Sequence, residues 1–171
     1  MKTFLTACVL LLISGCSYVV ELPLVVQTQT EWCWAAIGSM AAAHGSIPIR
    51  QCEVANIAYP GKKCCLRPYE CNIRLSVVSF DRLLQNDLGL TITTQKELPS
   101  YEEMRRHIAA NRIIIYAYGS FLEGHVVIIH GYNGNFFLIA NPALGDMWIE
   151  EPLYQKTRWQ TLYVGIVEAT R

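Results

Sequence analysis

One cysteine, Cys33, lies between Trp32 and Trp34 at the start of an alanine-rich run. We expect a helix over this run, WAAIGSMAAAHG, with Cys33 in its first turn. The aligned peptide dipoles place roughly half a positive charge at a helix N-terminus, and this charge stabilises a thiolate. Because the thiolate is the reactive form of cysteine, Cys33 is a candidate nucleophile as well as a candidate core residue.

A nucleophilic thiol also needs a base, and the chain has four histidines: His44, His107, His125 and His130. Gly124 and His125 open a β-branched run, which predicts that the His125 ring lies at the end of a sheet where a site can open. The odd offset of five residues places His130 on the other face of that strand. His44 lies at the far end of the Cys33 helix, about 16 Å away at 1.5 Å per residue. His107 falls in a charged amphipathic helix and is expected at the surface.

A third polar residue follows His125 at a useful spacing. Asn141 comes 141 − 125 = 16 residues later, on the far side of the hairpin signal Asn133-Gly134. The two ends of a hairpin lie together, so the Asn141 side chain can reach the His125 ring and orient it. The alternative is that Asn141-Pro142 forms a plain turn.

These residues require a helix and a sheet to hold them. Helical patterns come first, in the Cys33 run and in RQCEVANIAY, LSVVSFDRLLQNDLG and SYEEMRRHIAANR, the last opening with a Ser100/Glu103 capping box. Short strands are expected in VVELPLVV and LTITTQ. Four β-branched and aromatic runs then follow: IIIYAYG, HVVIIHGYN, NFFLIAN and TLYVGIVEA. We therefore predict an α+β domain with the Cys33 helix packed on an antiparallel sheet.

The start of the chain has the pattern of an export signal, with a lysine, an apolar run and small residues. The run is shorter than the ~20 residues that span a bilayer. Its end, Ile13 to Cys16, resembles a bacterial lipoprotein box, which implies cleavage before Cys16 and a lipid on its thiol. An ordinary signal peptide with a stray cysteine is the alternative. We predict a signal peptide over 1–15, a lipid-anchored tether over 16–24 and one domain over 25–171.

Export places the seven cysteines in an oxidising compartment. Cys8 leaves with the signal and Cys16 carries the lipid. Four others crowd together and are expected to form two disulfides: Cys52, Cys64, Cys65 and Cys71. Strain disfavours a bond between neighbouring cysteines, which leaves 52–64 with 65–71 or 52–65 with 64–71. Cys33 remains unpaired. The cluster has no histidine and no paired Cys-x-x-Cys spacing, so we expect neither a zinc site nor a cofactor.

Taken together, these residues resemble the papain-like cysteine proteases, most of all the compact bacterial branch with the staphopains and some plant-pathogen effector proteases. The resemblance covers nearly the whole predicted domain, from about Val25 to Ala169. The matching positions are Gln27, Cys33-Trp34-Ala35-Ala36, His125 followed by Gly131-Tyr132, and Asn141-Pro142.

The resemblance implies a role for each residue. Cys33 would be the nucleophile, His125 the general base and acid, and Asn141 the residue that orients the His125 ring. Gln27, 33 − 27 = 6 residues before Cys33, would share the oxyanion hole with the Cys33 amide, and Gln29 is a rival with worse spacing. We expect three residues to lie at the substrate cleft: Trp32, Trp34 and Gly124.

The function expected from these patterns is a lipid-anchored peptidase of the bacterial cell envelope that hydrolyses peptide bonds through a thioester acyl-enzyme. Ser17 after the lipidated cysteine favours the outer over the inner membrane. The substrate would be a protein or peptide. The alternatives are a catalytically silent binding lipoprotein, and a cell-wall amidase or acyl transferase of the same clan. The formal net charge of +0, with scattered charges, argues against nucleic-acid binding.

Overall fold

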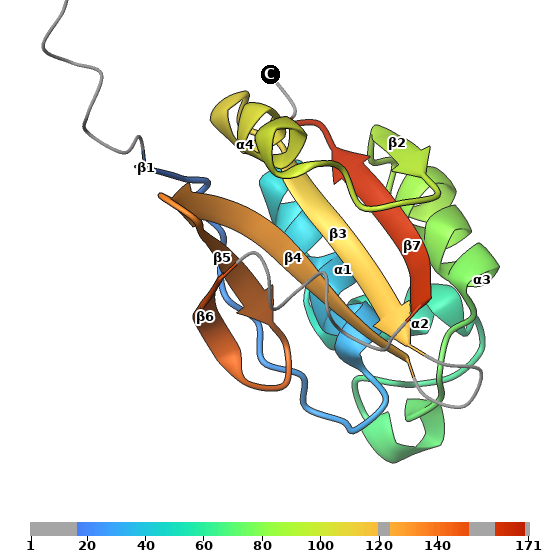
Figure 1. Ribbon diagram of the computed structural model, residues 1–171. Coiled ribbons are helices and arrows are strands. Elements are labelled where there is room, and N and C mark those ends of the chain that lie inside the picture. The colour runs from blue at the N-terminus through green and yellow to red at the C-terminus, as the bar shows by residue number, and fades with distance from the viewer. Residues whose placement is uncertain (1–16, 120–123, 151–159, 170–171) are drawn as a thin grey trace, which may run out of the picture.

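Helices come first and an antiparallel sheet follows in this protein, which confirms the predicted α+β class. The structure is a computed structural model that describes residues 17–119, 124–150 and 160–169. Figure 1 shows the twisted sheet with α1 (Cys33–His44) behind it and α4 (Tyr101–Ala109) in front, near one end. The sheet thus has a helix on each face, and the helix that begins with Cys33 covers one of them.

In the described part of the chain, seven strands form one sheet in the order β2-β7-β3-β4-β5-β6, with β1 paired to β4. The strands are β1 (Ser17–Val19), β2 (Ile92–Gln95), β3 (Ile113–Gly119), β4 (Gly124–Asn133), β5 (Phe136–Asn141), β6 (Gly145–Glu150) and β7 (Gln160–Val167). All their pairings are antiparallel. The central strand β3 is buried at every position except Tyr118, because helices cover both of its faces.

The remaining helical elements are short: α2 (Gln51–Ala58), the 3-10 helix η1 (Pro68–Cys71), α3 (Val77–Arg82) and the π-helical turn η2 (Leu83–Asp87). The third predicted helix is therefore α3 continued by η2. The predicted capping box at α4 is confirmed, since the Ser100 hydroxyl accepts from the Glu103 amide and the Glu103 carboxylate accepts from the Ser100 amide.

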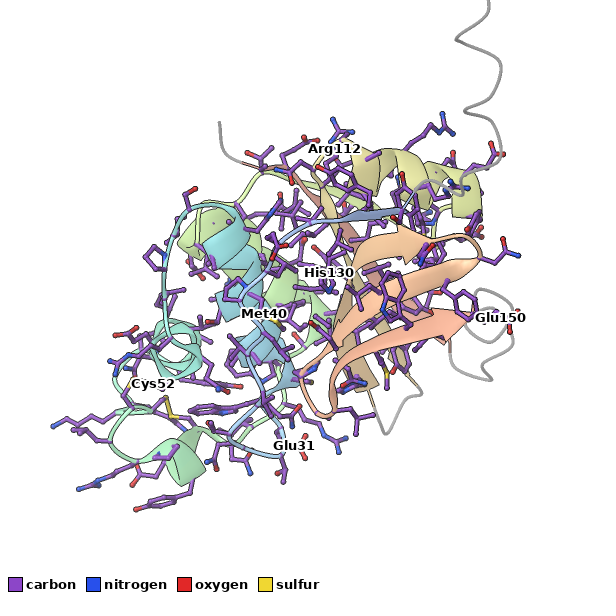
Figure 2. All side chains as sticks on the ribbon, turned by 90° about the vertical axis from the view of Figure 1, so that its left-hand side faces the viewer. Glu31, Met40, Cys52, Arg112, His130 and Glu150 are labelled. Atoms are coloured by element: carbon purple, nitrogen blue, oxygen red, sulfur yellow. A yellow bond between two sulfur atoms is a disulfide. The ribbon has the colours of Figure 1, made fainter. Side chains whose placement is uncertain are left out.

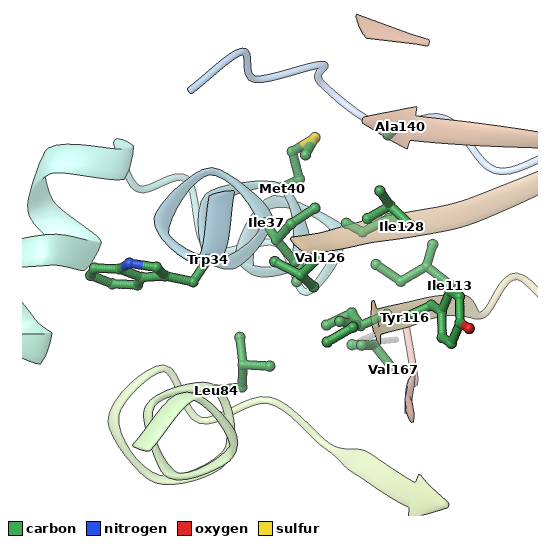
Figure 3. Packing of buried hydrophobic residues seen from close by; sticks show 14 of the residues in the cluster. Trp34, Ile37, Met40, Leu84, Ile113, Tyr116, Val126, Ile128, Ala140 and Val167 are labelled. Carbon is green, nitrogen blue, oxygen red and sulfur yellow. The ribbon is translucent and has the colours of Figure 1, made fainter. Parts of the chain in front are cut away.

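The helix α1 is the centre of the core. Every residue from Trp34 to Ala42 is buried, so the helix has no polar face. Its alanines leave room for close approach to the sheet, and Figure 3 shows Ile37 directed towards Val126 and Ile128 of β4. This packing holds the N-terminal end of α1 against the start of β4, and so it positions Cys33 relative to His125.

The structure corrects the predicted tether. Ser17–Val19 form β1 and pair with Gly131–Asn133 of β4, and the amide of Val20 donates to the carbonyl of His130 at 2.8 Å. The sheet therefore includes residues 17–19, which the prediction had assigned to the tether. The observed strand lies before the predicted run VVELPLVV and shares only Val19 with it. That run contains Pro23, a residue without an amide donor for a ladder. The predicted signal peptide and Cys16 lie outside the described residues.

The sequence analysis missed one strand. Residues Gly145–Glu150 form β6, which pairs with β5 at the edge of the sheet and alternates between half-buried and exposed positions. Its run, GDMWIE, has the period-2 alternation of an edge strand but few β-branched residues. None of the described helices has the length and apolar character that a membrane span requires.

Candidate active site

Cys33 is the first residue of α1, and two indoles attach this end of the helix to a neighbouring loop. The Trp32 Nε1 donates to the carbonyl of Cys71 at 2.7 Å, and the Trp34 Nε1 donates to the carbonyl of Ile73 at 3.0 Å. Trp34 lines the cavity at Cys33. Trp32 does not, because its ring is fully buried as an anchor for the helix.

The Cys33 thiol is half-buried, and burial raises its pKa. The backbone N–H groups of Val126 and Trp34 favour the thiolate and act against this rise, but burial is the larger effect. The net direction is therefore opposite to the stabilisation of a thiolate that is expected at a helix N-terminus. The thiol requires a neighbouring group that can take its proton.

His125 and Asn141 lie together, as the hairpin spacing predicts. The His125 Nε2 is 2.9 Å from the Asn141 Oδ1, and that oxygen also accepts from the amide of Ala143 at 2.9 Å. A backbone amide can only donate, so the Asn141 atom is the amide oxygen and His125 Nε2 carries the proton in the neutral ring. The Nδ1 atom then keeps its lone pair and is available as a base.

The hairpin that joins these two residues consists of β4 and β5. His125 is the second residue of β4, and Asn141 is the last residue of β5. Gly134 in the connecting turn has a φ of +56°, a conformation that glycine adopts at little cost. The predicted turn at Asn133-Gly134 is thus confirmed, and it sets the register that brings residues 125 and 141 together.

A further residue at the site was missed from the sequence. Tyr118 of β3 is paired with His125 of β4, and the two rings meet edge to face with 5.9 Å between centroids. Burial raises the pKa of the Tyr118 hydroxyl, and the nearby Tyr116 and Cys33 act in the same direction. Tyr118 therefore lies near both members of the candidate pair. The sequence carried no signal for it beyond an aromatic residue in a predicted strand.

Cys33 and His125 line the same cavity of about 220 Å³. The remaining wall is mostly apolar and comes from α1, the loop before α3, α3 and the sheet: Trp34, Leu75, Val77, Phe80, Ala117, Val126 and Leu162. Gly124 lines it too, as predicted. Glu31 and Arg74 also belong to the wall and form an ion pair, with 2.6 Å between Arg74 Nε and Glu31 Oε2. The cavity therefore has a mostly apolar wall with one charged pair in it.

The Gln27 side chain lies in the loop that leads into α1, and it is not part of the cavity wall. Its Nε2 donates to the carbonyls of Gln29 and Thr30, both at 2.9 Å, and its backbone amide donates to the carbonyl of Pro142 at 2.8 Å. The Oε1 atom is buried and has no hydrogen-bond partner among the described residues. The rival, Gln29, turns its amide onto the carbonyl of Thr28 and also lies outside the wall.

The cysteines pair as Cys52–Cys65 and Cys64–Cys71, which selects the second of the two predicted connectivities. Within the described ranges, Cys33 alone is a free cysteine. No group of three or more His, Cys, Asp or Glu side chains in these ranges is placed to hold a metal ion.

The other three histidines lie away from Cys33. His130 is buried and contacts the carbonyl of Val20 through Nδ1 at 2.8 Å. His44 is at the far end of α1, as predicted, and His107 lies on the partly exposed face of α4. Among the histidines, only His125 lines the cavity with the thiol.

No protein-family model matches the chain, and no curated protein matches its sequence. Solved structures do match. A double glycine motif protease from an AMS/PCAT transporter, in complex with the leader peptide, has a TM-score of 0.61 and 18% identity over 90% of this chain and 95% of that chain. The peptidase domain of Streptococcus ComA, a bifunctional ABC transporter, has a TM-score of 0.60 and 14% identity over 89% and 99%.

A C39-like peptidase from Bacillus anthracis has a TM-score of 0.63 and 12% identity over 91% of this chain and 99% of that chain. The Pseudomonas avirulence protein AvrPphB also matches, at a lower TM-score of 0.41 and 10% identity over 90% of this chain and 98% of that chain. The chain therefore has the fold of the C39-like and papain-like cysteine peptidases. The narrower resemblance to staphopains and effector proteases stays a prediction.

Proposed function

We propose that this protein is a cysteine peptidase that uses Cys33, His125 and Asn141. The observation that carries the proposal is the 2.9 Å contact between His125 Nε2 and Asn141 Oδ1, in a cavity that His125 shares with the free thiol of Cys33. This contact selects the tautomer in which Nδ1 can accept a proton. The same fold in peptidases of known structure supports the assignment at the level of fold.

The reaction would start from the protonated thiol, because burial raises the pKa of Cys33. His125 Nδ1 takes the thiol proton as the sulfur attacks the peptide carbonyl carbon, and Asn141 Oδ1 accepts from the Nε2–H of the imidazolium. His125 then gives the proton to the leaving amine as the carbon–nitrogen bond breaks. A water molecule activated by the same ring hydrolyses the thioester.

The negative charge on the carbonyl oxygen requires hydrogen-bond donors. Cys33 opens α1, so its amide has no acceptor within the helix and is available for this role. Gln27 would be the second donor. In the structure its Nε2 donates to the carbonyls of Gln29 and Thr30, so it must release one of them when the oxyanion forms.

The substrate would be a protein or peptide, with an apolar side chain in the cavity. This is supported by the mostly apolar wall beside Cys33 and by a similar protease that was crystallised with a leader peptide. Lipid attachment at Cys16 is part of the proposal. Since β1 starts at Ser17, the lipid would hold the domain close to an envelope membrane, with the outer membrane favoured. Replacing Cys16 with Ala should release the protein from the membrane fraction.

The test of the catalytic proposal is labelling of the oxidised mature domain with an epoxide-type papain inhibitor at pH 6. Wild type should be labelled on Cys33, and the label should be absent in Cys33→Ala and strongly reduced in His125→Ala. His107→Ala is the matched control, because that histidine lies on α4 away from the cavity. A folded wild type that takes no label would favour the silent binding lipoprotein.

A further inference from the structure

The two disulfides stabilise a compact segment that contacts the chain leading into Cys33. We call residues 51–74, with the Cys52–Cys65 and Cys64–Cys71 bonds, the cystine module. It contains α2 and η1, and its polar contacts reach residues 26–34, which we call the nucleophile segment. Since the two segments lie far apart in sequence, these contacts exist only in the folded protein.

The Asn72 side chain forms two hydrogen bonds with the nucleophile segment. Its Oδ1 accepts from the amide of Glu31 at 2.8 Å, and its Nδ2 donates to the Thr30 Oγ1 at 2.9 Å. One side chain thus holds two consecutive residues, at two and three positions before Cys33. Thr30 is also the residue whose carbonyl accepts from Gln27 Nε2, so Asn72 and Gln27 hold the same short turn.

The residues on each side of Asn72 hold the same segment. The carbonyls of Cys71 and Ile73 accept from the indoles of Trp32 and Trp34. Cys71 is fully buried and bonded to Cys64, so burial and a disulfide restrict the backbone immediately before Asn72. The module therefore presents Asn72 to the nucleophile segment from a rigid support.

The other end of the module holds the start of the segment. The Gln51 Nε2 donates to the carbonyl of Val26 at 2.9 Å, and its Oε1 accepts from the amide of Thr28 at 3.1 Å. These are the two peptide groups that flank Gln27. The next residue, Cys52, is bonded to Cys65, and Figure 2 shows this disulfide beside the Cys52 label. Both proposed oxyanion donors, Gln27 and the Cys33 amide, thus belong to a backbone that the cystine module holds at two points.

We propose that Asn72 is a positioning residue for the oxyanion hole, an inference that rests on the proposed function. It acts through the backbone of Thr30 and Glu31 and sets where the Cys33 amide and the Gln27 side chain lie. Such donors act only when they are held at the place where charge develops, so a small displacement lowers the rate of acylation. Among the described hydrogen bonds, those of the Asn72 side chain go to Glu31 and Thr30 and none goes to Cys33 or His125, so the reactivity of the thiol itself should not change.

Two reactions of Cys33 distinguish an effect on the oxyanion hole from an effect on the thiol itself. In acylation by p-nitrophenyl acetate, the sulfur bonds to the carbonyl carbon, the thiol proton passes to His125, and p-nitrophenolate leaves; the carbonyl oxygen becomes an oxyanion on the way. In alkylation by iodoacetamide, the thiol proton again passes to His125, the sulfur displaces iodide from a CH₂ carbon, and no oxyanion forms. A displaced oxyanion hole slows only the first reaction, whereas a perturbed thiol or a loosened fold affects both.

The experiment measures both rates in Asn72→Ala, Asn72→Asp and the control Asn135→Ala, an exposed residue in the β4–β5 turn. Asn72→Ala should lower acylation by about tenfold or more and leave alkylation within about twofold, because misplacement of a reacting group by ~1 Å can cost 10²-fold. Asn72→Asp should restore most of the acylation rate, since a carboxylate accepts from both the Glu31 amide and the Thr30 hydroxyl. Asn135→Ala should match wild type in both.

Three outcomes would overturn the inference. If Asn72→Ala acylates as fast as wild type, Asn72 does not position the oxyanion hole, and the proposed function is unaffected. If acylation and alkylation fall by the same factor, Asn72 serves the thiol or the fold instead. If wild type is alkylated at Cys33 but never acylated, the proposed function fails and the inference fails with it.

Discussion

The ring of Tyr118 meets the ring of His125 edge to face, with 5.9 Å between centroids, because the two residues are direct partners across β3 and β4. Asn141 contacts the same imidazole through Nε2. The histidine is thus held by an aromatic ring and by a hydrogen bond from two different strands. A general base that must face a single thiol needs this restriction of its side-chain rotation.

Removing the Tyr118 ring should therefore reduce activity more than removing its hydroxyl. In Tyr118→Ala the His125 ring gains freedom, and we expect the epoxide labelling rate of Cys33 to fall by about tenfold. Tyr118→Phe keeps the edge-to-face contact and should stay within about threefold of wild type. Labelling rates measured at matched protein concentration check this. Equal rates for the two variants would contradict a role for the ring.

Asn141 should affect activity because it selects the tautomer of His125. Asn141→Ala removes the acceptor at 2.9 Å from Nε2, so the neutral ring can place its proton on Nδ1, facing the thiol. We expect turnover of an acyl substrate to fall by about 10²-fold, within the usual range for general acid–base catalysis. Asn141→Asp should retain more activity, because it keeps an acceptor. A pH–rate profile of the three proteins provides the measurement.

The raised pKa of Cys33 predicts how reactivity depends on pH. Burial favours the protonated thiol, so without a base the thiolate appears only above the usual pKa range of cysteine. In His125→Ala, the rate of iodoacetamide labelling of Cys33 should thus be low at pH 6. It should increase about tenfold per pH unit until the pH reaches the raised pKa of the thiol. Wild type should react much faster at pH 6, and the two rates should converge in alkaline solution. Equal rates at pH 6 would mean that His125 does not take the proton.

Opening the Cys64–Cys71 bond should lower both stability and activity. Removing a native disulfide from a small exported domain costs about 2–5 kcal/mol, and the double variant Cys64→Ser/Cys71→Ser should show a clearly lower Tm. Because Cys71 supports the loop that binds Trp32, acylation of Cys33 should fall as well. Thermal unfolding and acylation rates test both parts. Strong reductant should act on wild type in the same direction, whereas a rise in activity would contradict this role for the disulfide.

The local sequence pattern was sufficient to predict the main helices and strands and to predict that His125 and Asn141 lie together. The β4–β5 hairpin carries its own turn signal, and a hairpin brings its ends together by local geometry alone. The α+β class followed from the order of helical and strand periods. The edge strand β6 was missed because its composition is weak in β-branched residues and its pairing with β5 supplies the stabilisation.

Other features depended on contacts between distant segments. Both disulfide connectivities were compatible with the spacing of the four cysteines, and only the placement of Cys52 beside Cys65 decided between them. The pairing of Tyr118 with His125 depends on strand register, which a run of β-branched residues does not specify. Burial of Cys33 against the sheet reversed the expected shift of its pKa.

Residue types and their spacing were enough to indicate which side chains could form the site, and that these would lie at a helix N-terminus and on a hairpin. Those are local properties, set by backbone propensity and by residue spacing. The folded chain was needed to show that β1 belongs to the sheet, that Trp32 is an anchor and Trp34 a wall residue, and that Asn72 holds the segment before Cys33. These depend on burial and on hydrogen bonds between distant segments, which no local pattern encodes. The separation is 39 residues for Trp32 and Cys71, 41 for Glu31 and Asn72, and 110 for Val20 and His130.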